Sequence, residues 1–292
     1  MSALEAAPRG IYWLASYPKS GNTWFRVLIN NLLADGPAPV SINALDHGSI
    51  SSARSWLDGL LGYASANLSA DEIDRLRPAL YRWSLRRPGI VHHKTHEAWT
   101  QTVDGEPLLC RQATLGAVYL LRNPLDVAVS AAAHWRCSID AAIERMGAPD
   151  AALSNTRTRL RPHVRQRLLS WSQHVCSWTD TPDLNCLVLR YEDLLADTAA
   201  QFGRASAHLG LPSDPARIAR AVQNSRFEEL ARQEREQGFR ERPPDAQRFF
   251  RAGRRGGWRQ QLTPAQVARL IADHGALMQR HGYVDCSGEP CD

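Results

Sequence analysis

Residues 11–33 read IYWLASYPKSGNTWFRVLINNLL, and this stretch decides the fold. The apolar run Ile11 to Ser16 ends at a Pro/Gly turn, which is typical of a buried strand. Thr23 to Leu33 then carries apolar residues at helical spacing. A strand, a glycine-containing turn and a helix in close succession form the frame that binds phosphate at a helix N-terminus. We therefore expect a phosphate loop placed as in P-loop nucleoside triphosphatases.

The rest of the chain alternates apolar strands with helices. Further strands are expected at Gly89–His96, Ala117–Leu121 and Leu184–Arg190. Apolar strands separated by helices predict a parallel sheet covered on both faces, so the expected fold class is a three-layer α/β fold. Helices are expected over Ala70–Leu85, Leu125–Trp135, His163–Trp178, Thr198–Leu209, Pro215–Asn224, Phe227–Gln237 and from Thr263 to about His281.

The length of the chain suits one domain over residues 1–292. Residues 37–87 mix loop with helical stretches and are expected to form an insertion, or lid, over the site. Residues 282–292 are expected to form a flexible tail. In parallel sheets of this class, ligands bind beyond the carboxyl ends of the strands. The residues that follow the strands are therefore the first place to look for function.

The chain is basic, with a net charge of +5 and a pI near 9.0. This charge suggests an anionic partner. No basic block is interleaved with aromatic residues, so a small anionic molecule is favoured over nucleic acid. No apolar run approaches roughly 18 residues and no signal-peptide pattern is present, so no membrane contact is expected and the protein is expected in the cytoplasm. The six cysteines are expected to be reduced thiols.

Among the 35 lysines and arginines, only Lys19 and Lys94 are lysines. Lysine is a compact point charge on a flexible stem, whereas arginine is a planar fork of donors. Lys19 lies in the turn of residues 17–24, and Lys94 lies in the sequence HHKTH of residues 92–96. Both stretches are typical of places where an anion is held or a proton is moved. The two lysines are therefore candidate functional residues.

The turn that contains Lys19 can surround a phosphate. The backbone N–H groups of Gly21, Asn22 and Thr23 and the Thr23 hydroxyl are available at the positive end of the helix. The turn is not a Walker A motif, because Lys19 precedes the glycine. No strand-end aspartate accompanies it to hold magnesium, so we expect the anion to bind without a metal.

A histidine-rich metal site is the alternative at the second strand. His92 and His93 could join His96 as ligands. No cysteine, aspartate or fourth ligand is spaced to complete the site, so no metal is expected.

Further motifs occur in a fixed order along the chain. Residues 17–24 read YPKSGNTW, 94–96 read KTH, 122–130 read RNPLDVAVS, 191–193 read YED and 251–259 read RAGRRGGWR. Together they resemble the soluble cytosolic-type sulfotransferases that use 3′-phosphoadenosine-5′-phosphosulfate (PAPS). The motifs appear in family order and span most of the chain. They resemble the 5′-phosphosulfate loop, the catalytic strand end, the 3′-phosphate motif and the late glycine-rich loop of that family.

The resemblance implies transfer of the sulfuryl group of PAPS to a hydroxyl or amine, with release of 3′-phosphoadenosine-5′-phosphate (PAP). His96 would take the acceptor proton, and Lys94 would stabilise the sulfuryl oxygens. The two residues lie two apart on a strand and so point to the same side. Lys19 would balance the charge that grows on the leaving phosphate. Ser130 completes the implied catalytic set.

The implied PAPS-binding residues come from the same motifs. Trp24 would stack on the adenine, Tyr191 would bond to its ring edge, and Arg122 would grip the 3′-phosphate together with Ser130. The full implied set is Lys19, Ser20, Gly21, Asn22, Thr23, Trp24, Arg122, Ser130, Tyr191, Arg251, Ala252 and Gly253.

The chain departs from the family pattern at several positions. Asn22 stands where threonine is common, Ala252 where lysine is usual and Gly257 where aspartate is usual. Pro264 and Ala268 stand where a dimerisation motif of many animal enzymes needs valine and glutamate. That mode of dimerisation is not expected here, and the oligomeric state stays open.

Two other functions stay open at the sequence level. One is a metal-dependent nucleotide phosphotransferase, which a requirement for magnesium and ATP turnover would indicate. The other is a nucleotide-binding module without catalysis. For a sulfotransferase, the acceptor is expected to be a small molecule or natural product. It is set by residues 37–87, the stretch after His96 and the 138–165 region, where no motif is recognisable.

Overall fold

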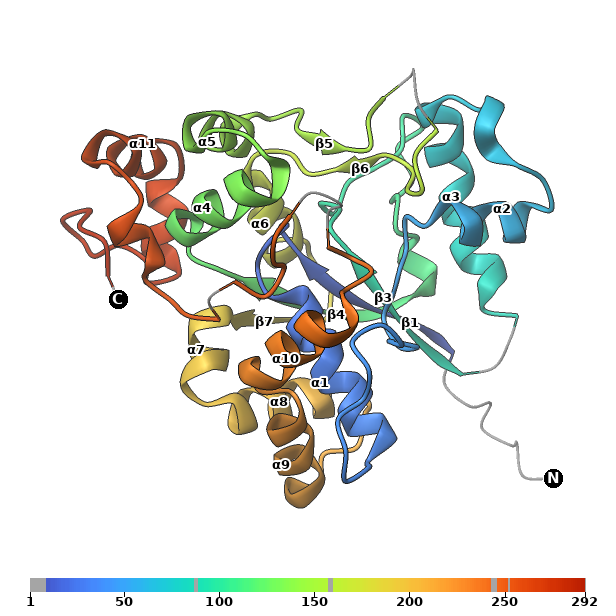
Figure 1. The fold of residues 1–292 in the computed structure, drawn as a ribbon. Coiled ribbons are helices and arrows are strands. Elements are labelled where there is room, and N and C mark those ends of the chain that lie inside the picture. Colours follow the sequence, from blue (N-terminus) through green and yellow to red (C-terminus); the bar gives the residue numbers. More distant parts are fainter. Residues whose placement is uncertain (1–8, 87–88, 157–159, 243–245, 252, 292) are drawn as a thin grey trace.

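The architecture is taken from a computed structural model, which describes residues 9–86, 89–156, 160–242, 246–251 and 253–291 (Figure 1). Ala252, one of the residues expected to bind PAPS, lies outside the described residues.

The described residues form a five-stranded parallel sheet in the order β2-β3-β1-β4-β7. The apolar stretch at the start of the chain forms its central strand, where Leu14 pairs with Lys94 on one side and Val118 on the other. The expected α/β fold with a parallel sheet is confirmed. The strands are β1 Gly10–Ser16, β2 Ser49–Ile50, β3 Ile90–Thr95, β4 Thr114–Leu121 and β7 Cys186–Arg190.

Both faces of the sheet are covered by helices because alternate strand residues are apolar on both sides. Trp13 packs with Trp178 and Tyr119 on one face, which is covered by α4 Pro124–Trp135, α6 Trp171–Thr179 and α11 Pro264–Arg280. Leu14 packs with Phe25 on the other face. That face is covered by α1 Asn22–Ala34, α8 Thr198–His208 and α9 Pro215–Asn224 (Figure 1).

The helix expected over His163–Trp178 is wrong in its first half. Ser170 accepts from the backbone N–H of Gln173 and Gln173 bonds back, so this capping box starts α6 at Trp171. Upstream of it, β6 Gln166–Arg167 pairs antiparallel with β5 Ala152–Leu153. Val164 N–H also donates to Ser52 C=O. Apolar spacing missed this strand because a strand of two residues is too short to show a periodic pattern.

The structure also describes further helices outside the two layers named above. The tail expected to be flexible, 282–292, begins with buried Tyr283 and Val284, and its mobility stays a prediction. These elements are α2 Arg54–Leu61, η1 Ser65–Asn67, α3 Ala70–Ser84, η2 Arg111–Ala113, α5 Ile139–Gly147, α7 Tyr191–Ala196, α10 Phe227–Gln237 and η3 Gly257–Gln260.

Candidate active site

The turn after β1 presents an open helix end. Lys19 and Gly21 adopt left-handed backbone angles, with φ of 72° and 95°. A side chain at Gly21 would clash, because its Cβ would lie 2.7 Å from Cδ2 of the Tyr191 ring. Gly21 is the N-cap of α1 and no side chain caps that end. The first N–H groups of α1 are therefore available to an anion.

Lys19 lies within a cluster of positive charges. Burial, and then the nearby Lys94, Arg122 and Arg251 charges, together lower its pKa to about 8, although the Glu241 carboxylate opposes this shift. The Lys19 Nζ also lies 4.3 Å from the centre of the Phe249 ring. Concentrating four cations in one place is costly unless an anion balances them. The site is thus built for a ligand of high negative charge.

Arg122 joins three of the sequence motifs. Its Nη1 donates to the Lys19 carbonyl at 3.0 Å, and its Nη2 donates to the Arg254 carbonyl at 3.3 Å. Its guanidinium lies 4.4 Å from the centre of the Tyr191 ring. Its buried Nε has no hydrogen-bond partner in the described part of the chain. The phosphate loop, the end of β4 and the late loop thus meet at one side chain.

Aromatic rings line the same end of the site. The Trp24 and Tyr191 rings meet edge to face, and Trp24 Nε1 donates to the Ser225 carbonyl at 3.0 Å. Phe227, which the sequence motifs do not include, also lines the cavity and lies against Gly253. A Cβ at Gly253 would come within 2.4 Å of the Phe227 ring, so glycine is required there.

His96 follows β3 and is held in one orientation. Its Nδ1 lies 2.9 Å from the Ser16 carbonyl, and its own carbonyl accepts from His174 Nε2 at 3.1 Å. An Nδ1–H donor to Ser16 leaves Nε2 as the basic nitrogen. Burial, and then the Lys94 charge, lower the pKa of His96 well below its usual range. His96 is therefore neutral at pH 7 and able to take a proton.

Lys94 lies beside His96 and is paired with Glu241, a residue that the sequence analysis did not single out. The Lys94 Nζ lies 3.2 Å from Glu241 Oε2, and Glu241 Oε1 lies 2.5 Å from Arg26 Nη1. Glu241 comes from the segment after α10, far from β3 in the sequence. In the sequence, Glu241 is one acidic residue between Arg240 and Arg242, and this pattern does not indicate a site.

One cavity of about 1660 Å³ contains both the phosphate loop and His96. It unites nearly all of the expected residues that the structure describes: Lys19, Gly21, Asn22, Thr23, Trp24, Lys94, His96, Arg122, Ser130, Tyr191, Arg251 and Gly253. Ser20 is buried beneath it, and its Oγ has no partner among the described residues. The Asn22 Nδ2 donates to the Leu14 carbonyl at 2.8 Å and to the Ser16 hydroxyl at 3.1 Å, so the donor that Asn22 can offer an anion is its backbone N–H.

The two histidines that could have completed a metal site are turned elsewhere. His92 Nε2 contacts the Leu209 carbonyl, and His93 Nδ1 contacts the Ser49 carbonyl. Within the described ranges, no group of three or more His, Cys, Asp or Glu side chains is placed to hold a metal ion.

The far end of the cavity is lined by residues of separate chain segments. Gln166 is buried and its Oε1 has no hydrogen-bond partner among the described residues. His163 Nδ1 is likewise without a described partner. The lining residues on this side include Leu45, Ser49, Ile50, Val129, Ala133, His134, Trp135, Arg145, Ala152, Leu153, Ser154, Asn155, Thr156, Arg161, Pro162, His163 and Gln166.

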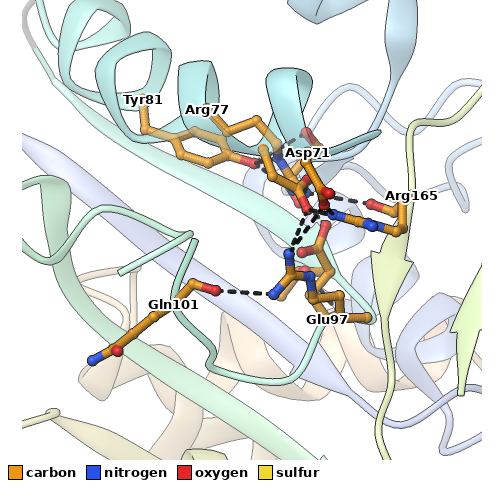
Figure 2. A network of polar contacts seen from close by, with 10 residues as sticks. Asp71, Arg77, Tyr81, Glu97, Gln101 and Arg165 are labelled. Atoms are coloured by element: carbon orange, nitrogen blue, oxygen red, sulfur yellow. Dashed lines mark hydrogen bonds and ion pairs between the residues drawn. The ribbon is translucent and has the colours of Figure 1, made fainter. Parts of the chain in front are cut away.

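A buried ionic network fastens these segments beside His96 (Figure 2). The Arg77 side chain on α3 is fully buried and pairs with the equally buried Glu97, the residue after His96. Asp74, also on α3, accepts from Arg165 Nε at 3.2 Å. Removing one partner from a buried pair of this kind typically costs about 3–5 kcal/mol. The 37–87 segment is thus tied to both β3 and β6.

The described helices include none that is both long and apolar enough to span a membrane.

The model of the sulfotransferase domain family matches residues 11–282. Sulfotransferase 2A6 of Rattus norvegicus is 25% identical over 266 residues, which cover 87% of this chain and 79% of the relative. Flavonol 3-sulfotransferase of Flaveria bidentis is 22% identical, with 91% of this chain and 80% of the relative covered.

Solved structures share the fold. Mouse sulfotransferase SULT7A1 complexed with PAP aligns with a TM-score of 0.58 and 21% identity, over 97% of this chain and 88% of the mouse chain. Retinol dehydratase in complex with androsterone and PAP also aligns with a TM-score of 0.58, at 22% identity, over 93% of this chain and 82% of its own.

Proposed function

Because this chain belongs to the sulfotransferase family and transfers the sulfuryl group of PAPS to an acceptor, we propose that its cavity holds PAPS at the phosphate loop and the acceptor beside His96. The observation that carries this assignment is the cluster of Lys19, Arg122 and Arg251 around an uncapped helix end. A nucleotide with phosphates at both its 3′ and 5′ positions supplies the balancing anions.

The donor side fits PAPS in chemistry as well as in charge. Arg122 Nε, buried without a described partner, is suited to a phosphate oxygen, as are the open N–H groups at the start of α1. Ser130 lines the cavity from α4 and is assigned to the same 3′-phosphate as Arg122. The aromatic rings of Trp24 and Phe227 offer faces for the adenine.

The proposed transfer moves one proton and one sulfuryl group. His96 Nε2 takes the proton of the acceptor hydroxyl while the acceptor oxygen forms a bond to sulfur. The bond from sulfur to the bridging oxygen breaks, and PAP leaves with that oxygen. Lys19 balances the charge that grows on the leaving phosphate, and Lys94 faces the sulfuryl oxygens from the other side. We expect no metal in this step, because the cations of the chain take that role.

The proposed acceptor is a small molecule with a hydrogen-bond donor in addition to its reacting hydroxyl. Gln166 and His163 both line the cavity, and the Gln166 Oε1 and His163 Nδ1 atoms are buried without described partners. Buried polar groups of this kind are normally satisfied, so a donor on the ligand is their natural partner. The strand that holds Gln166 is hydrogen-bonded to the segment that follows His96: the Ala98 N–H donates to the Arg167 carbonyl at 2.8 Å. Gln166 therefore lies near the proposed base.

We also propose that the protein works in the cytoplasm. All six cysteines are free thiols, which suits a reducing compartment.

The test is transfer of ³⁵S from labelled PAPS into a metabolite extract of the source cells, with EDTA present and products separated before mass spectrometry. We expect a labelled organic product and PAP in equal amounts. A chain that instead needs magnesium and phosphorylates the extract from ATP is a phosphotransferase. A chain that binds PAP without labelling any product is a non-catalytic binding module.

A further inference from the structure

The carboxylate of Glu241 bridges the phosphate-loop helix and the catalytic strand. Its Oε1 lies 2.5 Å from Arg26 Nη1 on α1. Its Oε2 lies 3.2 Å from Lys94 Nζ and accepts from the Thr23 hydroxyl at 3.4 Å. Although burial opposes ionisation, the Lys94 and Arg26 charges hold the pKa of Glu241 at about 2. Glu241 is therefore a fixed negative charge inside the cavity at neutral pH.

Arg26 keeps this carboxylate on α1. The Arg26 side chain is 6% exposed, and its own carbonyl is held by Asn30 Nδ2 at 2.8 Å. If Glu241 moved away, a buried guanidinium would lose its counter-ion, which is strongly unfavourable. Arg26 therefore holds the Glu241 carboxylate in place independently of Lys94.

The contact with Glu241 favours the charged form of Lys94 and fixes the orientation of its ammonium group. Burial lowers the pKa of Lys94, and the Glu241 carboxylate opposes that loss. An ammonium group has three N–H donors. The contact to Glu241 uses one of them and leaves two for oxygen atoms of a ligand.

We propose that Glu241 is a positioning residue, which fixes the Lys94 ammonium so that its two other donors face the sulfuryl oxygens. This inference rests on the role proposed above for Lys94. Glu241 acts through Lys94 and transfers no proton itself. Glu241 thus forms a direct ion pair with the acceptor-side lysine, whereas among the described contacts its charge reaches Lys19 only at longer range.

Other charged and titratable groups also influence Lys94, so its titration is a property of the whole site. They come from the phosphate loop, α1, the end of β3, α4 and the segment before β6: Lys19, Arg26, His96, His134 and His163, together with Glu241 itself.

The chain offers a direct probe, because it holds only two lysines. Full-length protein labelled with [ε-¹³C]lysine gives two side-chain NMR signals, and Lys19→Arg assigns them. In Glu241→Gln we expect Lys94 to titrate at lower pH than in wild type, because an opposite charge favours the ammonium form. The control Glu228→Gln removes one negative charge from another part of the same cavity and should leave the Lys94 signal unchanged. An unchanged Lys94 titration in Glu241→Gln would overturn the proposal.

Turnover measurements distinguish a Glu241 that positions Lys94 from a Glu241 that blocks the sulfuryl position. We expect Glu241→Gln to lower kcat by about 10–100-fold, in the range known for misplaced catalytic groups, and to move the alkaline limb of the pH profile to lower pH. PAP should bind at least as tightly, because a negative charge has been removed. Glu241→Asp keeps the charge and should restore part of the rate. A rise in kcat in Glu241→Gln would mean that Glu241 blocks the sulfuryl position, which contradicts the proposal. The NMR result stands even if no PAPS turnover is found, so failure of this inference and of the proposed function can be distinguished.

Discussion

The two ends of the cavity, to which we assign the donor and the acceptor, are built in different ways. The donor end takes consecutive residues of one turn, Lys19 to Trp24, and adds single residues that directly follow strands, such as Arg122 and Tyr191. The acceptor end takes its lining from segments that meet only in the folded chain, among them residues 45–50, 129–135 and 152–166. The donor end is therefore local in sequence and the acceptor end is not.

This difference follows from what each end must bind. Every member of a family with one donor meets the same phosphates, and a helix N-terminus is the simplest way to hold them. The acceptor varies, so the segments around it need only be fastened in place. In this chain the buried pair of Arg77 and Glu97 provides that fastening (Figure 2). If the comparison is right, variants at the two ends will have separable effects on donor binding, acceptor binding and chemistry.

The largest expected effect is at the junction of the two ends. We expect His96→Ala to lower kcat by about 10²–10⁴-fold, the usual contribution of a general base, while PAP binding stays near wild type. Turnover by ³⁵S transfer and PAP binding by calorimetry check this. His92→Ala is the matched control, because His92 lies on the same strand and contacts the Leu209 carbonyl instead of the cavity. Near-normal turnover in His96→Ala would remove the general-base role.

The donor end is tested by Arg122→Ala. Loss of charge-assisted hydrogen bonds is typically worth about 1.5–3 kcal/mol, so PAP should bind roughly tenfold to a hundredfold more weakly. Arg122→Lys keeps the charge but loses the planar arrangement of donors, so its PAP affinity should lie between those of the wild type and Arg122→Ala. Calorimetric PAP affinity that is unchanged in Arg122→Ala would place the 3′-phosphate elsewhere.

The donor end also predicts a pH dependence. The pKa of Lys19 is lowered to about 8 in the free protein, and a bound phosphate would raise it. Above pH 8, binding must therefore take up a proton, so PAP affinity should fall by up to about tenfold per pH unit. Calorimetry between pH 7 and 9 measures this fall. In Lys19→Arg the fall should be reduced, because arginine does not titrate in this range. A PAP affinity independent of pH in wild type contradicts the placement of Lys19.

The smallest expected effect is at the acceptor end. We expect Gln166→Leu to raise the acceptor KM by about 2–10-fold, as for loss of one hydrogen bond of about 0.5–1.5 kcal/mol. PAP affinity should not change. The measurement uses the acceptor identified by ³⁵S transfer, with PAP binding as the internal control. A change in PAP affinity, or an unchanged KM, would show that Gln166 does not contact the acceptor.

The sequence predicts the donor end because strand, turn and helix there are adjacent in the chain. No local sequence pattern predicts the order of the strands, in which β1 lies between β3 and β4. This order brings His96, Lys19 and Arg122 to one edge of the sheet. Each of these residues follows a strand, so the general rule for parallel sheets was enough to group them.

The acceptor end could not be predicted in the same way. Glu241 contacts Lys94 although the two residues are distant in sequence, and β5 pairs with β6 through two residues of each strand. Neither contact leaves a periodic pattern in the sequence. The helix predicted over His163–Trp178 was wrong for the same reason. Gln166 belongs to the short strand β6, and its pairing with β5 cannot be recognised from apolar spacing. Buried pairs such as Arg77 and Glu97 become visible only once the chain is folded.

The central claim is that the sulfuryl group lies between the two lysines, and their NMR signals test it directly. With [ε-¹³C]lysine in the full chain and no acceptor present, we expect PAP, which lacks the sulfuryl group, to shift mainly the Lys19 signal. PAPS should shift both signals, because Lys94 then contacts the sulfuryl oxygens. A Lys94 signal that is the same with PAPS as with PAP would contradict the account.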